Sequence, residues 1–463
     1  MFAEQCRFFS NVVVGANGVN GTNGLAGTNS ANTELITPGT PGSPGSAGQE
    51  ALGGAVFNAG SLTLRHCFFS TNTALGGAGG AGGNGGAGGN ARGGAVAGAG
   101  IFQMESCTFS NSVARGGDGG QGGAGGGSGS SSPMPPRGSS GLGGTGGIAQ
   151  GGAVFNPGSL FLSNSLLAGS VAQGGSGGNV VNPGFGRFPA PEGGAAAGGA
   201  IYNASNSVLV NATLFASAAR GGSRRNDTCN CVAFNGGNSV GGAIANIGFI
   251  QAINLTLDNS SASAGLGYST PYYGGTNGNS YGGSIASTGG VFQIVNTILS
   301  GGTSNNCFGV ITDLGHNLSS DATPAWASGT SVNNIDPLLL PLGNYGGPTL
   351  TMALHAGSPA LNNADCALAP PTDQRGFPRP AGPGCDLGAT EGASAPTLQL
   401  FRNTPPPHLL RWTAKAGRTY HVEAATSLNA WTAYATNVAA TNGPLERSVP
   451  VSAPERFFRL QAE

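Results

Sequence analysis

The chain has 463 residues, of which 88 are glycine, while charged residues make up only 8% and the formal net charge is −1. The balanced charge excludes the basic surface that nucleic-acid binding needs, and no apolar run reaches the roughly 18 residues of a membrane-spanning helix. Hydrophobic residues account for 38% of the chain, which is more than a disordered polypeptide carries. We therefore expect a folded protein with no nucleic-acid partner and no integral membrane segment.

Residues 1–50 begin inside a repeated unit. Their segment from Cys6 to Asn11 (CRFFSN) matches the segment from Cys67 to Asn72 (CFFSTN) of a later unit. The first residues have neither the basic region nor the apolar region of a signal peptide. We expect an N-terminally incomplete chain, with an export signal upstream of Met1. A cytosolic protein is the alternative.

A recurring unit that opens with two glycines organises residues 51–300. Its copies begin at Gly53, Gly93, Gly151, Gly198, Gly241 and Gly282. Spacings of about 40 to 60 residues between copies are typical of repeat architectures.

Aligning the copies brings like residues into columns. One column contains Val56, Val96, Val154, Ile201, Ile244 and Ile285. A second contains Phe8, Phe69, Phe109, Leu167, Leu214, Leu257 and Leu299. A third begins with Cys6, Cys67 and Cys107 and continues with Ser165, Ala212, Leu255 and Thr297. The second and third columns lie two residues apart, which places them on one face of a strand.

No helical period runs through these units, so their segments are predicted to be strands and turns. A single unit cannot bury its apolar face alone and must stack on its neighbours. The sequence therefore predicts an all-β fold, a parallel β-helix or solenoid. Four asparagines, Asn58, Asn156, Asn203 and Asn246, are expected to stack in one of its turns.

Glycine-rich loops join the predicted coils at residues 76–92, 116–150, 174–197, 221–240 and 264–281. The first of them is built of GGA and GGN triplets. Two interpretations stay open. The segments are flexible surface loops, or they are extended helices of three residues per turn that pack side by side on one wall of the solenoid.

The pattern changes after residue 300. Residues 301–392 carry the motifs Asp336-Pro337-Leu338, Gly346-Gly347-Pro348-Thr349, Ser358-Pro359-Ala360, Asp373-Gln374-Arg375-Gly376 and Asp386-Leu387-Gly388-Ala389. Residues 393–397 form a short linker. Residues 398–463 alternate apolar and polar positions, which predicts a small β-sandwich module.

These motifs carry a resemblance to a known family. The glycine-glycine units resemble the repeats of right-handed parallel β-helix proteins of the polymorphic-outer-membrane-protein type. Residues 301–392 resemble the choice-of-anchor Q domain, which closes such helices in bacterial surface proteins, and the tail is similar to a small β-sandwich of exported bacterial proteins. The resemblance implies a right-handed helix, export, residence at the cell surface or outside the cell, and an adhesive or structural role.

Two positions depart from the family pattern. Ala322, Thr323 and Pro324 stand where the family often has a partner for the cysteine at Cys307, and Thr390 replaces an aromatic residue before Glu391. Neither departure affects the expected fold, but the first leaves Cys307 without its usual partner.

The remaining cysteines fall into three groups. Cys366 and Cys385 flank the Asp373 motif, and in an exported protein we expect them to form a disulfide that closes a loop of about 20 residues. Cys229 and Cys231 are so close in sequence that a disulfide between them would be strained. The cysteines of the third column are interpreted as small apolar core residues.

No catalytic, cofactor or metal site is predicted. The acidic residues between positions 51 and 300 are Glu105, Asp118, Glu192, Asp227 and Asp258. They fall in different coils, whereas glycoside hydrolysis needs carboxylates that converge. The histidines show no metal-binding spacing.

Two groups of residues are candidates for a functional role. The first comprises the possible ligand contacts Tyr268, Tyr272, Tyr273 and Tyr281 of the last long loop. Aromatic side chains favour recognition, and packing within the loop is the alternative. The second comprises Asp373, Arg375, Arg379, Asp386 and Glu391. We expect these to form an ion-pair clasp against the last coil, with a ligand site as the alternative.

The sequence as a whole predicts a monomeric, secreted or cell-surface bacterial protein of structural or adhesin-like type. It is expected to bind an extracellular glycan or surface ligand without catalysis and without a cofactor. A β-helix carbohydrate-active enzyme, either a polysaccharide lyase or a glycoside hydrolase, is the alternative. A spacer that binds no ligand is a third hypothesis.

Overall fold

The computed structural model describes residues 1–26, 28–29, 36–37, 40–123, 141–179, 191–223, 234–269, 274–392, 399–401, 408–414, 419–425, 432–438, 443–449 and 457–462. The chain divides into two compact units, Met1–Glu391 and Gly392–Glu463. No helix occurs among the described residues, so the described fold is all-β. Tyr272 and Tyr273, Cys229 and Cys231, and the linker at 393–397 lie outside the described residues.

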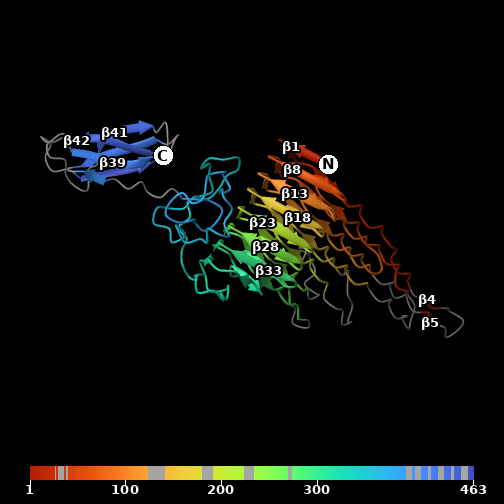
Figure 1. Ribbon diagram of the computed structural model, residues 1–463. Coiled ribbons are helices and arrows are strands. Elements are labelled where there is room, and N and C mark those ends of the chain that lie inside the picture. The colour runs from red at the N-terminus through yellow and green to blue at the C-terminus, as the bar shows by residue number, and fades with distance from the viewer. Residues whose placement is uncertain are drawn as a thin grey trace. The chain divides into compact units, whose positions relative to one another are not determined.

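Long stacks of parallel strands form the first unit (Figure 1). Sheet A contains, in spatial order, β1 (Phe2–Glu4), β8 (Ser61–Arg65), β13 (Ile101–Glu105), β18 (Ser159–Ser163), β23 (Asn206–Val210), β28 (Phe249–Ile253), β33 (Val291–Val295) and β36 (Thr312–Asp313). Sheet B contains β2 (Arg7–Phe9), β9 (Phe68–Ser70), β14 (Thr108–Ser110), β19 (Leu166–Ala168), β24 (Thr213–Phe215), β29 (Thr256–Asp258), β34 (Ile298–Ser300) and β37 (Leu318–Ser319).

Three further parallel sheets complete the stack. Sheet C contains β3 (Val12–Val14), β10 (Thr73–Leu75), β15 (Val113–Arg115), β20 (Val171–Gln173), β25 (Ala218–Arg220) and β30 (Ser261–Ser263). Sheet E contains β6 (Ala51–Leu52), β11 (Ala91–Arg92), β16 (Ala149–Gln150), β21 (Ala196–Ala197), β26 (Ser239–Val240) and β31 (Ser280–Tyr281). Sheet F contains β7 (Val56–Phe57), β12 (Val96–Ala97), β17 (Val154–Asn156), β22 (Ile201–Asn203), β27 (Ile244–Asn246), β32 (Ile285–Ser287) and β35 (Cys307–Gly309).

Each coil of the chain visits these sheets in a fixed order. One coil, for example, runs through β6, β7, β8, β9 and β10, and so through sheets E, F, A, B and C. The next coil repeats the order one strand further along every sheet. This arrangement is compatible with a β-helix solenoid, and we refer to the stack of coils as the solenoid. A short antiparallel pair, β4 (Thr28–Asn29) with β5 (Ile36–Thr37), is sheet D.

Columns of like residues build the core of the solenoid, as the sequence predicts. Val56 pairs with Val96 and Phe69 pairs with Phe109 in neighbouring coils. The rings of Phe8, Phe69 and Phe109 stack, with centroids 4.5 and 4.7 Å apart. The two apolar columns share one buried cluster with members of the cysteine column. The predicted register is therefore confirmed.

The turn between sheets A and B has a left-handed backbone residue in successive coils. Asn164, Asn211, Asn254 and Asn296 stand at this turn with φ between 47° and 53°. Asparagine tolerates this conformation better than most residues. The chain can therefore bend from one sheet to the next without a glycine at this corner.

The expected asparagine stack lies at the last residues of three sheet F strands, β17, β22 and β27. Asn156 Nδ2 donates to Asn203 Oδ1 at 2.8 Å, and Asn203 Nδ2 donates to Asn246 Oδ1 at 2.9 Å. Asn58 donates to backbone carbonyls instead, because Gly98 occupies its position in the next coil. The stack thus links three consecutive coils, and Asn58 stands apart from it.

A column of alanines closes the interior where sheet E faces sheet C. Its buried members are Ala51, Ala74, Ala91, Ala114, Ala149, Ala172, Ala196 and Ala219. They alternate between the two sheets along the chain. Side chains this small let the two sheets approach closely, so the interior ends there and the chain continues outward as paired segments.

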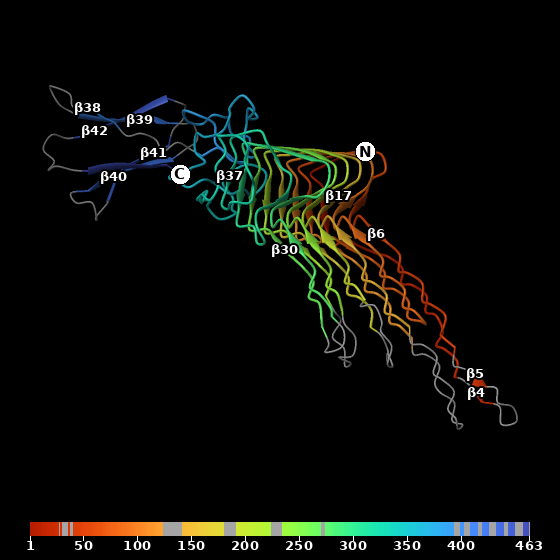
Figure 2. The same ribbon diagram turned by 90° about the horizontal axis from the view of Figure 1, so that it is seen from below.

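The glycine-rich segments run outward and back beside one another (Figure 2). We call them the array; its described residues are 15–26, 40–50, 76–90, 116–123, 141–148, 174–179, 191–195, 221–223, 234–238, 264–269 and 274–279. Of the two interpretations that the sequence leaves open, side-by-side packing is the one present in these residues.

Backbone hydrogen bonds with a period of three hold the array together. In the GGX triplets of residues 76–90 the first glycine donates to the next coil: Gly79 N donates to Asp118 O and Gly85 N to Leu142 O, both at 2.8 Å. The second glycine donates between outgoing and returning segments, as Gly86 N does to Gly80 O at 2.8 Å. A period of three is that of an extended polyproline-type helix, which makes no hydrogen bonds within itself.

The third residue of each triplet has a distinct role. Where it is asparagine, its side chain accepts a hydrogen bond from the backbone of the adjacent coil. Asn84 Oδ1 accepts from Leu142 N at 3.0 Å, and Asn90 Oδ1 accepts from Ile148 N at 2.9 Å. Glycine is required at the other two positions, because a Cβ on Gly86 would overlap the carbonyl oxygen of Ser46.

Residues 301–391 end the first unit. Strands β35, β36 and β37 add last members to sheets F, A and B. The remainder is mostly irregular and packs around a small cluster of Ile298, Leu318, Leu354, Ala360 and Leu387.

The described strands of the second unit form two three-stranded antiparallel sheets. One consists of β38 (Gln399–Phe401), β39 (His408–Ala414) and β42 (Gly443–Val449). The other consists of β41 (Thr432–Val438), β40 (Thr419–Ala425) and β43 (Phe457–Ala462). Trp412 and Tyr420 lie in its buried cluster with ring centroids 6.3 Å apart. Antiparallel pairing agrees with the strand pattern expected for this module.

Candidate binding surface

An open hollow of about 400 Å³ lies on the outer face of sheet A. It spans four neighbouring strands, β13, β18, β23 and β28. Its outward-facing lining residues are Ile101, Gln103, Ser159, Phe161, Asn206, Val208 and Phe249. The alternate residues of the same strands, such as Leu162, point inward and are buried in the core.

Differences in side-chain size create this hollow. Ile101, Ser159, Asn206 and Phe249 occupy one row across the sheet. Two small polar residues therefore lie between two large apolar ones. With neighbouring strands about 4.8 Å apart, the two large residues are separated by about 14 Å. Phe161, which is 45% exposed, forms a wall in the adjacent row.

The hollow combines apolar walls with neutral polar groups. The Ser159 hydroxyl and the Asn206 carboxamide make no hydrogen bond to another residue in the described part of the chain. Gln103 accepts a hydrogen bond from the Thr63 hydroxyl at 3.3 Å. None of the described residues that line the hollow is charged. Such a lining suits a neutral ligand that has both hydroxyl groups and an apolar face.

The predicted tyrosines do not lie at this hollow. Tyr268 exchanges two backbone hydrogen bonds with Phe234 at 2.8 and 2.9 Å, at the end of the array. Tyr281 belongs to β31, and its ring centroid is 4.5 Å from that of Phe308. Tyr272 and Tyr273 lie outside the described residues. The described tyrosines therefore belong to two separate places.

Sequence reasoning overlooked the hollow, although a signal for it exists. In the segment Ser159-Leu160-Phe161-Leu162 the alternation places leucines inward and leaves Phe161 outward. A single exposed apolar residue is normal on a protein surface, so Phe161 alone is a weak signal. Ser159 and Asn206 can be assigned to the hollow only when the register between coils is known.

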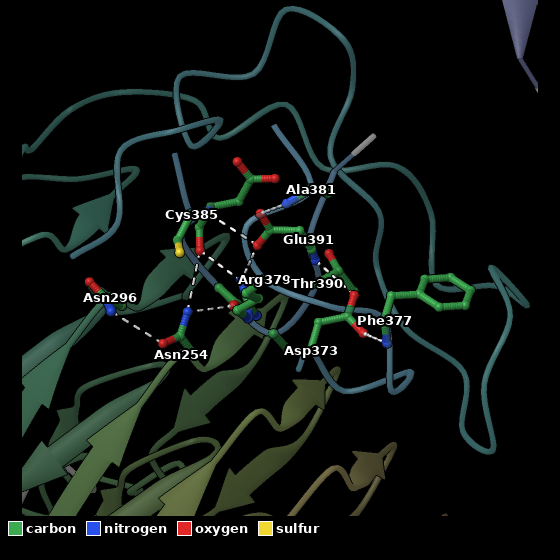
Figure 3. A network of polar contacts seen from close by, with 12 residues as sticks. Asn254, Asn296, Asp373, Phe377, Arg379, Ala381, Cys385, Thr390 and Glu391 are labelled. Carbon is green, nitrogen blue, oxygen red and sulfur yellow. Dashed lines mark hydrogen bonds and ion pairs between the residues drawn. The ribbon is translucent and has the colours of Figure 1, made fainter. Parts of the chain in front are cut away.

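The five residues of the expected clasp lie together at the end of the first unit. Figure 3 labels three of them, Asp373, Arg379 and Glu391. Arg375 donates from Nε and Nη2 to Asp373 Oδ2 at 2.9 and 2.6 Å. Arg379 Nη1 donates to Glu391 Oε2 at 2.7 Å and to the carbonyl oxygen of Asp386 at 2.9 Å. The backbone N–H of Glu391 donates to Asp373 Oδ2, which joins the two ion pairs.

The clasp is shielded from solvent. The Arg379 and Glu391 side chains are 1% and 0% exposed. Burial lowers the pKa of Arg379, while the nearby Glu391 carboxylate acts in the opposite direction. Among the described residues, Arg379 Nε is the buried side-chain atom of the clasp that has no hydrogen-bond partner. This geometry matches a structural clasp, because side chains so fully enclosed present almost no surface to a ligand.

Turn asparagines of the solenoid anchor the clasp segment. Asn211 Nδ2 donates to the carbonyl oxygen of Thr372 at 2.7 Å, and Asn254 Nδ2 donates to that of Gly388 at 3.2 Å. Thr256 Oγ1 accepts from Ala389 N at 2.9 Å. The asparagines that adopt the left-handed turn therefore also hold residues 372–388 against the side of the coils.

The cysteines differ in state. Cys366 and Cys385 form a disulfide. Cys6, Cys67, Cys107 and Cys307 are free thiols, and the last three are buried. Burial raises the pKa of Cys107 to about 12 and also raises the pKa of Cys307.

Two described acidic residues of the coils form ion pairs with nearby arginines. Glu105 pairs with Arg65 at 3.1 Å, and Asp118 pairs with Arg115 at 3.5 Å. Burial raises the pKa of Asp258, and a hydrogen bond from Ser300 partly offsets this rise. Within the described ranges no group of three or more His, Cys, Asp or Glu residues is placed to hold a metal ion. No helix there is long and apolar enough to cross a membrane.

No protein-family model and no curated protein sequence matches this chain. The strand pairing is therefore the basis for the architecture.

Proposed function

We propose that this is a non-catalytic, adhesin-like protein of the cell surface or extracellular space, which binds a neutral glycan on the outer face of sheet A. The proposal includes a right-handed β-helix of the polymorphic-outer-membrane-protein type, closed by a choice-of-anchor Q-like segment. Support for the class comes from the stacked parallel strands and from the motif series between Asp336 and Ala389. The disulfide between Cys366 and Cys385 favours an oxidising compartment.

The lining of the hollow is the observation that carries the binding role. A concave site with apolar walls and a few polar groups is the usual form of a small-ligand site. Phe161 offers an aromatic face on which the C–H groups of a sugar ring can stack, and Asn206 offers both a donor and an acceptor to its hydroxyl groups. The described lining residues are neutral, which suits a ligand without charge.

Isothermal titration calorimetry with a panel of neutral oligosaccharides tests the proposal. We expect at least one of them to bind the full chain, and Phe161→Ala or Asn206→Ala to weaken that binding by about threefold to tenfold. Phe9→Ala is the matched control, because Phe9 is an exposed phenylalanine (52%) on sheet B. Equal binding by all variants would exclude the hollow, and release of shortened products would favour a carbohydrate-active enzyme.

A further inference from the structure

The first two coils of the solenoid bring two cysteines side by side. β1 pairs with β8, and β2 pairs with β9, at the same offset in sequence. Cys6, which lies between β1 and β2, is therefore the direct neighbour of Cys67. Hydrogen bonds hold this register on both sides, because Gln5 N donates to Arg65 O at 2.9 Å and Phe68 N donates to Cys6 O at 2.8 Å.

The geometry around the two thiols favours a covalent link. Cys67 Sγ lies 3.5 Å from the carbonyl oxygen of Ala3, so this thiol is directed toward the first coil. The turns that carry the two cysteines also match, since Gln5 and His66 both have a left-handed backbone, with φ of 53° and 49°. Neighbouring parallel strands lie about 4.8 Å apart, and a disulfide spans Cα atoms that are roughly 4.4–6.8 Å apart.

Access to solvent differs along the cysteine column. Cys6 is partly exposed, whereas Cys67 and Cys107 are 1% and 0% exposed. In the described sheets, β1 and β2 are the end strands of sheets A and B. The first coil can therefore shift slightly toward the second, while Cys107 is packed between coils on both sides. A dissolved reagent reaches the column through Cys6.

We propose that Cys6 and Cys67 form an oxidation site, at which a small-molecule disulfide converts the two thiols into a disulfide that joins the first two coils. The Cys6 thiolate attacks one sulfur of the reagent, forms a mixed disulfide and releases the first small thiol. The Cys67 thiolate then attacks Cys6 Sγ and releases the second. The protein sulfurs lose two electrons, the reagent gains them, and the two protons end on the two small thiols.

The setting of the chain agrees with this chemistry. Cys366 and Cys385 of the same unit form a disulfide, and disulfides persist in oxidising compartments. The new link would close a loop over residues 7–66, which includes the first outgoing and returning segments of the array. A disulfide that closes a long loop restricts the unfolded chain strongly. It would therefore fasten the end coil to the rest of the solenoid.

The alternative is that the column stays reduced and serves only as apolar core. Burial raises the pKa of Cys67, which makes its attack the slower of the two steps. The matched register, the direction of the Cys67 thiol and the exposure of Cys6 favour the disulfide. The site is independent of the hollow on sheet A, so either assignment can fail without the other.

Tryptic peptide mapping of the full chain tests the proposal. The chain, with its column thiols reduced, is treated with oxidised glutathione, unfolded, alkylated and digested without reduction. Trypsin cleaves after Arg7, Arg65, Arg92 and Arg115, so the three cysteines fall in the separate peptides 1–7, 66–92 and 93–115. We expect peptide 1–7 to be linked to peptide 66–92, and Cys107 to carry the alkyl label.

Matched variants separate this link from other oxidation products. Cys6→Ser should leave Cys67 reduced, and Cys107→Ser should form the link as the wild type does. Oxidation should slow amide exchange in β1 and β2 by about tenfold or more in the wild type and leave it unchanged in Cys6→Ser.

Three results would overturn the site: alkylation of all three cysteines, a link between Cys67 and Cys107, or a glutathione adduct that stays on Cys6 while Cys67 is alkylated. A link that leaves exchange in β1 and β2 unchanged would contradict its role in fastening the end coil.

Discussion

The coils of the solenoid and the glycine-rich array share one repeat but are held together by different forces. In the coils, side chains such as Phe69 and Phe109 stack into an apolar interior. In the array there is almost no side-chain interior, and backbone groups of neighbouring segments bond directly, as Gly86 N bonds Gly80 O. The first region gains stability by removing apolar surface from water, the second by close approach of backbones that glycine allows.

This difference predicts opposite sensitivities to mutation. The coils should suffer when a large side chain becomes small, because a cavity is left behind. The array should suffer when a small residue becomes larger, because a carbonyl oxygen occupies the space that a Cβ would need. The expected effects below run from the largest to the smallest.

Phe109→Ala removes a fully buried ring from the phenylalanine stack. We expect the free energy of unfolding of the first unit to fall by about 3–5 kcal/mol. Chemical denaturation followed by circular dichroism measures this change. An equal loss from Phe57→Ala, which removes an exposed ring, would contradict the assignment of the core.

Arg375→Ala tests a third kind of interaction, a buried ion pair, which lies in neither the coil interior nor the array. Removing one partner leaves the Asp373 carboxylate buried without its cation, at a cost of about 3 kcal/mol. The melting temperature of the first unit should fall. A melting curve identical to that of the wild type would contradict a structural role of the clasp and would favour the alternative that these residues form a ligand site.

Gly86→Ala adds a single methyl group to the array. We expect a loss of about 1–3 kcal/mol, confined to the array, because the added Cβ would overlap the Ser46 carbonyl oxygen. Hydrogen exchange resolved by peptide measures how local the loss is. Ala87→Ser at the neighbouring third position of the triplet is the control and should change little; equal effects of both variants would mean that the segments do not pack.

Because Cys107 is buried in the apolar interior of the coils, the free energy of unfolding should depend on pH. Burial raises the pKa of this thiol from 9.0 to about 12, so stability is complete below pH 9 and falls as the unfolded chain ionises above it. At pH 10 the loss should be about 1 kcal/mol. The stabilities of the wild type and Cys107→Ala between pH 8 and 10 should therefore converge, and parallel pH profiles would contradict burial.

Asn84→Ala removes one side-chain acceptor from the array. The backbone N–H of Leu142 then bonds water instead, and the expected cost is about 0.5–1 kcal/mol. Faster exchange at Leu142 with no change at Ile148, which donates to Asn90, would confirm that each asparagine holds its own position in the array independently. Faster exchange at both would point to a general loosening.

Sequence alone could predict the coils because their columns repeat in residue type. The valine and phenylalanine columns fall into register as expected, and the clasp residues lie together as their clustering in the sequence predicts. The alanine column between sheets E and C could not be predicted, since alanine is too common to stand out. Nor could the state of the glycine-rich segments, because a GGX triplet has the same composition in a flexible loop and in a packed helix.

The candidate surface was harder to predict for a physical reason. Phe161 and Asn206 form a hollow only through the pairing of β18 with β23. The hollow therefore depends on register between distant segments. Of the tyrosines singled out by sequence, the two that the structure describes, Tyr268 and Tyr281, do not line the hollow.

Amide hydrogen exchange across residues 76–90 tests most directly whether the glycine-rich triplets continue the solenoid as an ordered array. We expect slow exchange at the first and second glycines of each triplet, such as Gly85 and Gly86, comparable to that in β13 and β14. Complete exchange of all these amides within seconds, while the strands remain protected, would contradict an ordered array.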